Sequence, residues 1–122
     1  MPRDYTAKSD QGKTDWSLLP WKILEQMAQI MTQAIEPKEQ GGKGYGLASW
    51  RTVPGGYYRY WSAFMRHATR RFVYGEVIDQ ESGFHHTAHM LCNIAFIGEI
   101  DIEAMSNKLS ESDSVNFYER DI

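Results

Sequence analysis

Apolar residues recur at three- and four-residue spacing in three separate stretches of the chain, and this period predicts three amphipathic helices. The first helix is expected from about Ser17, which suits an N-cap, with Pro20 tolerated in the first turn. Its apolar stripe consists of Trp21, Leu24, Ala28, Met31 and Ile35. Glu25 borders this stripe, so it is either an exposed side chain or a carboxylate that needs a partner beside a buried face.

The second predicted helix covers residues 57–75, with Gly75 suited to end it, and the third covers residues 85–100. The second has the apolar stripe Tyr57, Trp61, Phe64, Ala68 and Phe72, and the expected buried side of the third is Met90, Leu91, Ile94 and Ile97. His86, His89 and Asn93 stand at i, i+3 and i+7, so they project from one face of the third helix. Residues 101–122 are expected to form a short final helix or a tail that docks on a partner subunit.

The helical period is lost in residues 37–56, which contain six of the ten glycines. A loop of about twenty residues is unusual in so short a chain, so it is either an active-site flap or a flexible linker. It carries Tyr45 and Trp50, which suit stacking on a ring, and Arg51, which suits clamping a phosphate.

These patterns predict an all-α protein, a small bundle of three to four main helices with a long glycine-rich loop between the first and the second. We expect one domain over residues 1–122, with an N-terminal arm in residues 1–16. No apolar run approaches the roughly 20 residues of a membrane span, and the polar N-terminus does not resemble a signal peptide. The single cysteine, Cys92, agrees with a reducing compartment, and we expect a cytoplasmic protein.

The net charge of −3 is unevenly distributed. Residues 38–71 hold seven basic side chains and one acid, whereas carboxylates gather in residues 76–81 and after residue 99. A basic segment beside a carboxylate cluster is typical of a metal–phosphate site, and the alternative is a solvated basic helix face. The negative net charge and the short basic region argue against an extended nucleic-acid groove.

Three of the four histidines lie at positions 85, 86 and 89, close to Glu76, Asp79 and Glu81. If the second and third helices are antiparallel across a short turn, Glu76 and Asp79 face His86 and His89. A first helix antiparallel to the second would bring Glu25 to the same end. Carboxylates and histidines from facing helices are how helical bundles build metal sites, and an ordinary polar corner is the alternative. Carboxylate oxygens suit Mg²⁺ or Mn²⁺, whereas imidazoles favour Mn²⁺, Co²⁺, Ni²⁺ or Zn²⁺.

Several segments resemble the phage and bacterial dATP/dGTP diphosphohydrolases (MazZ type), which belong to the MazG-like all-α nucleotide pyrophosphohydrolases. These segments are DQGKTDWSLLPW, YGLASWR, Arg66–His67 and GEVIDQESGFHHTAHMLCN, and the resemblance covers roughly residues 10–100. It implies a metal-dependent enzyme that cleaves a purine deoxynucleoside triphosphate to the monophosphate and pyrophosphate. It also implies a phage protein that remodels the deoxynucleotide pool in the host cytoplasm.

The chain departs from this family pattern at the metal ligands. MazG relatives bind magnesium through Glu-x-x-Glu on one helix and Glu-x-x-Asp on a later one. Here Ala28 follows Glu25 three residues on, and His86 and His89 stand where the acidic pair is expected. The resemblance therefore implies the reaction and leaves the metal and its ligands open.

We expect Glu76 and Asp79 to hold one or two divalent ions, with Glu25, His86 and His89 completing the site. Glu25 is the first candidate to accept the proton of the attacking water. The expected phosphate-binding residues are Lys13, Lys43, Arg51 and Arg66, and the remaining substrate-site residues are Tyr45 and Trp50 for the base and His67 and Asn93 for orienting the ligands.

We also expect a homo-oligomer, a dimer or tetramer, because aromatic residues surround more than one face of the second predicted helix. Its interface is expected to include that helix and the segment after Asp101. Two other functions stay open. One is a different helical metal-dependent phosphohydrolase that releases phosphate or triphosphate, and the other is a non-enzymatic phage protein that binds nucleotide, nucleic acid or a host factor.

Overall fold

The computed structural model describes residues 11–46 and 48–107, and this part of the chain forms helices and loops without a β-strand. The three α-helices are α1 (Trp21–Ile35), α2 (Gly56–Phe72) and α3 (His86–Ser106). Three short 3-10 helices accompany them, η1 (Trp16–Leu18), η2 (Lys38–Gln40) and η3 (Ser49–Arg51). The prediction of a small all-α bundle is confirmed.

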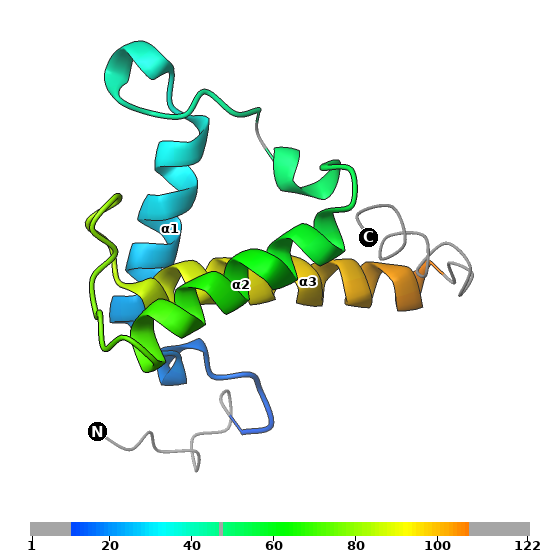
Figure 1. Ribbon diagram of the computed structural model, residues 1–122. Coiled ribbons are helices and arrows are strands. Elements are labelled where there is room, and N and C mark those ends of the chain that lie inside the picture. Colours follow the sequence, from blue (N-terminus) through cyan, green and yellow to red (C-terminus); the bar gives the residue numbers. More distant parts are fainter. Residues whose placement is uncertain (1–10, 47, 108–122) are drawn as a thin grey trace.

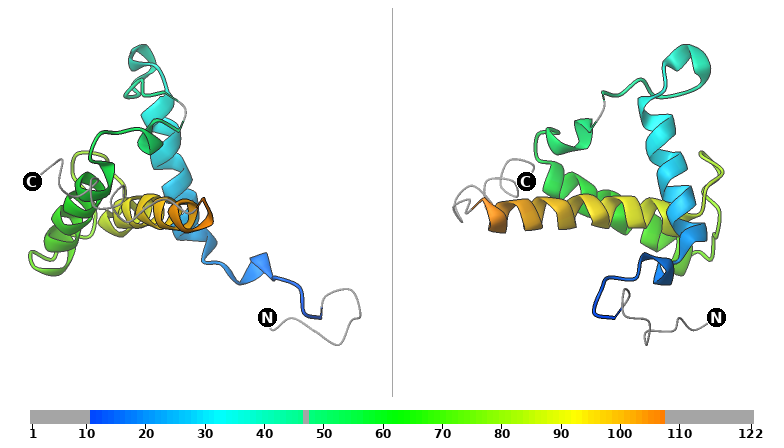
Figure 2. Two further views of the ribbon diagram at one scale, coloured as in Figure 1. Left: turned by 90° about the vertical axis from the view of Figure 1, so that its right-hand side faces the viewer. Right: turned by 180° about the vertical axis from the view of Figure 1, so that it is seen from behind.

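Helix α3 is the centre of the arrangement, because it contacts both other α-helices (Figure 1). Helices α2 and α3 lie side by side and run in opposite directions, as expected. Helix α1 instead crosses α3 steeply, near the N-terminal end of α3 (Figures 1 and 2). This differs from the expected antiparallel packing of the first helix on α2. The Cys92 thiol of α3 lies 3.7 Å from the Met27 carbonyl of α1, whereas Phe96 contacts Tyr60 of α2. An apolar helix of this kind can pack against a neighbour on two sides.

The predicted start of the first helix is wrong by several residues. Ser17 lies in η1, where its backbone N–H donates to the Asp15 carboxylate over 3.0 Å, and α1 begins at Trp21 with Pro20 at its N-cap. The cause is Pro20 itself, because a residue that precedes proline avoids the helical region. Leu19 accordingly has extended angles, φ −72° and ψ 146°.

The predicted apolar stripes are only partly correct. Phe72 and Ile94 are exposed, with relative accessibilities of 65% and 42%, although both were expected to be buried. The side chains that α3 buries are those of His86, Ala88, Cys92 and Ile97. The inner face of α2 includes Tyr60 and His67, which both contact α3. Polar and aromatic residues therefore occupy part of the buried face of these helices. For this reason the buried positions do not coincide with the apolar stripes.

The end of α3 also differs from the prediction. It continues to Ser106, so residues 101–106 belong to it and form no separate element. The predicted docking tail in residues 108–122 and most of the N-terminal arm, residues 1–10, lie outside the described residues. None of the α-helices in residues 11–46 and 48–107 is both long and apolar enough to cross a bilayer.

The loop after α1 folds back on the end of that helix. Gly44 and Tyr45 donate backbone hydrogen bonds to the carbonyls of Glu36 and Ala34, at 2.7 and 2.8 Å. Gly42 has to be glycine for this return, because a Cβ there would lie 2.3 Å from the Glu36 carbonyl oxygen. Residues 48–55, which include η3, lead into α2, and a cavity lies between α1, α3 and this part of the chain.

Candidate metal centre

The corner between α2 and α3 is held by backbone hydrogen bonds that place two carboxylates beside α3. Glu76 N–H donates to the Arg70 carbonyl at the end of α2, over 3.0 Å. His86 N–H donates to the Val77 carbonyl over 3.0 Å, and Asp79 N–H donates to the Phe84 carbonyl over 2.8 Å. These bonds fold residues 73–85 against the first turn of α3, so Glu76 and Asp79 face its histidines.

Glu76, His86 and His67 form a hydrogen-bonded chain from the corner into the α2–α3 interface. The His86 Nε2–H donates to Glu76 Oε1 over 2.8 Å, and His86 is 2% exposed. Its other ring nitrogen, Nδ1, lies 2.9 Å from Nδ1 of His67 on α2. One of these two nitrogens must carry the shared proton. In the tautomer of His86 that directs its Nε2 proton at Glu76, Nδ1 accepts from His67 Nδ1–H.

Asp79, Ser82 and His89 form a second chain. The Ser82 hydroxyl donates to Asp79 Oδ2 over 2.8 Å, and His89 Nε2 lies 2.7 Å from the Ser82 oxygen and 3.4 Å from Asp79 Oδ2. Because the Ser82 proton is directed at Asp79, the His89 Nε2–H donates to Ser82. Burial raises the pKa of Asp79, but hydrogen bonds from Ser82 and from the Glu81 backbone outweigh it, so the net pKa is lowered. Asp79 is therefore a carboxylate at neutral pH.

The two chains meet where His67 stacks on His89, with ring centroids 4.5 Å apart and an interplanar angle of 4°. Burial, followed by the proximity of His89 and His86, lowers the pKa of His67 to about 4. Burial also lowers the pKa of His89, against the opposing effect of Asp79. Both imidazoles are thus neutral near pH 7, the form that donates or accepts through either nitrogen and can bind a metal.

Glu76, Asp79 and His86 fit a divalent ion, because one ligand atom from each lies within 4.8 Å of the others. Two carboxylates and one imidazole are a donor set that Mg²⁺, Mn²⁺ and Zn²⁺ all accept in proteins. Each of these three side chains is at least partly buried. The described residues thus provide half or more of a coordination shell and leave positions for water or substrate.

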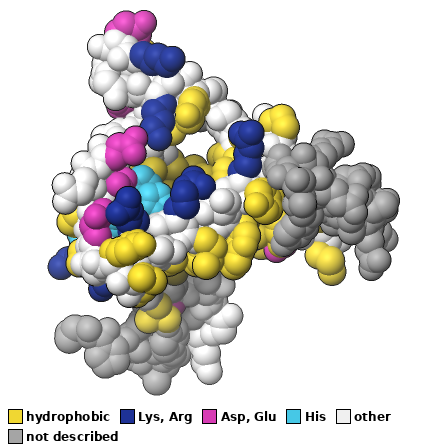
Figure 3. All heavy atoms as spheres, viewed as in Figure 1, with side chains coloured by type: hydrophobic (Ala, Val, Ile, Leu, Met, Phe, Trp, Pro, Cys, Tyr) yellow, Lys and Arg dark blue, Asp and Glu magenta, His cyan; other side chains and the backbone are white. Residues whose placement is uncertain are grey.

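The candidate ligands line a polar cleft of about 860 Å³ between α2, the corner and the end of α1. Its charged and histidine side chains are Lys43, Arg66, His67, Arg70, Glu76, Asp79, Glu81, His86 and His89. Figure 3 shows histidines on this face with basic and acidic side chains around them. The three cationic residues stand beside three carboxylates, which is the combination that a metal-bound polyphosphate requires.

The other predicted site residues are divided between different places. Glu25 is exposed on α1, and Lys13 is exposed before η1. Neither residue lines this cleft or a second cavity, between α1 and α3, that His89 also lines. Arg51 forms an ion pair with Glu103 and lies 4.0 Å from Glu99, so it points to α3 and not into the cleft. Tyr45, Trp50 and Asn93 line the second cavity, together with His89.

Three residues of this region were not predicted from the sequence. Arg70 lines the cleft and stands four residues after Arg66, so helical spacing alone places both on one face. Ser82 joins Asp79 to His89, and no sequence pattern indicates this contact. Gln26 of α1 bonds His85, its Oε1 accepting from the backbone N–H over 3.0 Å. The His85 ring also contacts Gln26, with Nδ1 2.9 Å from its amide nitrogen, so it faces α1 and not the carboxylates.

A family model described as dATP/dGTP diphosphohydrolase, N-terminal, matches residues 3–109 of the chain. No curated protein and no solved structure matches the chain.

Proposed function

The chain belongs to the dATP/dGTP diphosphohydrolase family, and we propose that it hydrolyses dATP and dGTP to the monophosphate and pyrophosphate with a divalent ion. The observation that carries the proposal is the convergence of Glu76, Asp79 and His86 on the wall of a cleft that also holds three cationic side chains. A triphosphate needs both kinds of group, because a metal and basic residues share its charge.

Glu76, Asp79 and His86 would hold the ion, which when bound neutralises phosphate charge and lowers the pKa of a coordinated water. The ligand set favours Mg²⁺ or Mn²⁺ through its carboxylates, and its imidazole also admits Co²⁺, Ni²⁺ or Zn²⁺. Lys43, Arg66 and Arg70 bind the phosphate oxygens, with the two arginines projecting from one side of α2.

His67 acts as a positioning residue for His86. If His86 coordinates through Nε2, its remaining proton is on Nδ1, which lies 2.9 Å from Nδ1 of His67. His67 then accepts this hydrogen bond and holds the imidazole of His86 in one tautomer and one orientation. The lowered pKa of His67, about 4, keeps its acceptor lone pair available at neutral pH.

His89 is our candidate for accepting the proton of the attacking water. It lines the same cleft, and its lowered pKa leaves it neutral near pH 7, so an unprotonated ring nitrogen is available. Ser82 and Asp79 orient the ring and stabilise it once it is protonated. We prefer His89 to Glu25 for this step, because Glu25 is exposed and lines no part of the cleft.

The test is a panel of deoxynucleoside and nucleoside triphosphates assayed with Mg²⁺, Mn²⁺ and Co²⁺, with products separated by chromatography. We expect the monophosphate and pyrophosphate from dATP and dGTP, and no turnover after chelation. Release of phosphate or triphosphate would instead identify another phosphohydrolase. Absence of turnover with every nucleotide and metal would favour a non-enzymatic binding protein.

A further inference from the structure

A second cavity, of about 350 Å³, lies between α1, α3 and residues 45–46 and 48–53. Its volume falls within the range of roughly 300–1,000 Å³ found for small-molecule sites. It is lined mainly by apolar and aromatic side chains, whereas the polar cleft is lined by charged ones. His89 lines both spaces, so one side chain separates the polar cleft from the apolar cavity.

An aromatic wall closes one side of the cavity. The Trp50 indole stacks on the Phe96 ring of α3 with centroids 4.7 Å apart and an interplanar angle of 13°. Tyr60 meets Phe96 edge-on at 5.0 Å and donates its hydroxyl to the Trp50 carbonyl over 2.6 Å. Burial raises the pKa of Tyr60 to about 12, so this hydroxyl keeps its proton. The indole is therefore held in place by contacts to α2 and α3.

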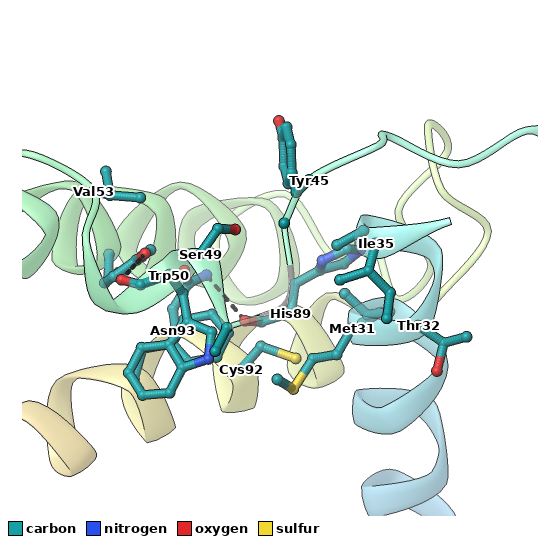
Figure 4. Close-up of a pocket in the computed structure, with 16 residues that line it drawn as sticks. Met31, Thr32, Ile35, Tyr45, Ser49, Trp50, Val53, His89, Cys92 and Asn93 are labelled. Carbon is teal, nitrogen blue, oxygen red and sulfur yellow. Dashed lines mark hydrogen bonds between the residues drawn. The ribbon is translucent and has the colours of Figure 1, made fainter. Parts of the chain in front are cut away.

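Opposite this wall the cavity is bounded by α1 and the middle of α3. Figure 4 shows His89, Cys92 and Asn93 of α3 between the α1 side chains Met31 and Ile35 and the segment that carries Trp50. Burial raises the pKa of the Cys92 thiol to about 11, so it presents a neutral surface. Tyr45 is 55% exposed and its ring stands apart from this group in Figure 4. Trp50 rather than Tyr45 thus forms the aromatic wall of the cavity.

Asn93 adds one polar group to this largely apolar lining. Its side-chain nitrogen donates to the His89 carbonyl one turn earlier, over 2.9 Å. In residues 11–46 and 48–107 no donor bonds its Oδ1, although the residue is half-buried and lines the cavity. Adenine and guanine both carry N–H groups on their edges that a carboxamide oxygen can accept.

The residues that cover the cavity, 45–46 and 48–53, are held in place on both sides of it. Tyr45 N–H donates to the Ala34 carbonyl of α1 over 2.8 Å. At the other end, Arg51 pairs with Glu103 of α3, and its guanidinium lies over the Trp50 ring at 4.6 Å. A site that is already formed loses less free energy to ordering when a ligand binds.

We propose that this cavity receives the purine base of the substrate, with Trp50 contacting the base as part of the aromatic wall and the Asn93 Oδ1 accepting one of the base N–H groups. The assignment rests on the proposed function, because the phosphates then occupy the polar cleft on the other side of His89. One ligand then fills both spaces, with its base in the apolar cavity and its anionic phosphates in the polar cleft.

The experiment measures binding by calorimetry in the presence of Mn²⁺, with two ligands. One is the α,β-methylene analogue of dATP, which has a base and is not cleaved between these phosphates, and the other is inorganic tripolyphosphate, which has no base. We expect Trp50→Leu to weaken analogue binding roughly 5- to 100-fold, because it removes apolar surface against which the base would be buried, and to leave tripolyphosphate binding unchanged. Asn93→Leu should also weaken the analogue selectively.

Matched variants keep the result interpretable. Trp50→Phe retains an aromatic ring over Phe96 and should bind the analogue nearly as well as the wild type. Trp21→Leu removes an exposed indole that lines neither cavity and should change neither affinity. Tripolyphosphate binding also reports whether each variant is folded.

Unchanged analogue affinity in Trp50→Leu overturns the base assignment, even if dATP is hydrolysed as proposed. Equal weakening of both ligands overturns it too, because the effect would then not belong to the base. Analogue binding that depends on Trp50 in a protein without hydrolytic activity would leave the base site standing and overturn the proposed function.

Discussion

Side chains in the candidate centre act through one another, so substitutions there should have effects that differ by position. Glu76 contacts His86, and His86 contacts His67, at 2.8 and 2.9 Å. Asp79 reaches His89 both directly and through Ser82. Removing one member leaves its neighbours with altered hydrogen bonds, and a loss of activity has to be separated from a loss of folding.

Glu76→Gln should reduce turnover by more than about 100-fold, beyond the 10- to 100-fold typical of residues that only support a metal ligand. The substitution keeps the size of the side chain and removes a charge that stands near Asp79, so the metal-free protein should be no less stable. Steady-state kinetics at saturating metal and thermal unfolding in EDTA measure the two effects.

Glu25→Gln is the matched control, because Glu25 is exposed on α1 and outside the cleft. We expect it to retain near-normal turnover. An equal loss in Glu25→Gln would mean that α1 brings this carboxylate to the metal in the active form, and near-normal turnover of Glu76→Gln would refute the ligand assignment.

The metal-free protein should lose stability as the pH falls from about 6.5 to 4. The pKa of His67 is lowered to about 4 in the folded state, so in this window the unfolded chain binds more protons at this position than the folded one. The loss should reach about 1–2 kcal/mol below pH 4, because solvent screens part of the shift of this half-buried imidazole, with His89 acting in the same direction. Asp79, whose pKa is lowered, contributes only at lower pH.

Urea unfolding in EDTA at several pH values measures this slope. His67→Asn removes the titrating ring and should flatten this slope. A slope that is the same in His67→Asn as in the wild type would assign the pH dependence to other groups.

At the scale of elements, the link between α1 and α3 depends on few polar contacts. Gln26 bonds His85 twice. Its Oε1 accepts from the His85 backbone N–H over 3.0 Å, and its Nε2 lies 2.9 Å from Nδ1 of the His85 ring. None of the residues of α1 is fully buried, so polar contacts such as this pair contribute to its attachment. The same contact orients the start of α3, where His86 begins the helix.

Gln26→Ala should destabilise the protein by about 1–2 kcal/mol, because it leaves a part-buried N–H of His85 without its partner. Gln29→Ala, on the exposed side of the same helix, should change the free energy of unfolding by less than about 0.5 kcal/mol. Urea unfolding measures both. Equal effects of the two substitutions would mean that the Gln26–His85 contact contributes nothing.

At the scale of the whole molecule, large apolar side chains remain uncovered. Trp61 and Met65 on α2 are 44% and 43% exposed, and Ile102 and Met105 near the end of α3 are 63% and 82% exposed. Exposed apolar residues of this kind mark protein–protein contacts when they gather on one surface. They lie on the elements that the sequence assigns to a subunit interface.

We therefore predict a homo-oligomer, at least a dimer, that buries the outer side of α2. Light scattering at micromolar concentration should give a multiple of 14.1 kDa. Trp61→Glu should lower the measured mass toward that of the monomer, because it places a charge in the proposed interface. Gln29→Glu, which adds the same charge on the exposed side of α1, should not. A fully active wild-type monomer would contradict the prediction.

The helices and the carboxylate–histidine grouping were predictable from the sequence because they depend on local order in the chain. Glu76, Asp79, His86 and His89 all lie within one short corner and one helical turn. Their convergence follows from the antiparallel return of α3 along α2 and from helical spacing.

The positions of Glu25, Arg51 and Trp50 could not be predicted in this way, because each depends on contacts between segments distant in sequence. The hydrophobic period of α1 does not specify the angle at which it crosses α3, and that angle leaves Glu25 outside the cleft. The loop after α1 has no period at all. Pairing with Glu103 carries Arg51 away from the cleft, and stacking on Phe96 places Trp50 on the wall of the second cavity.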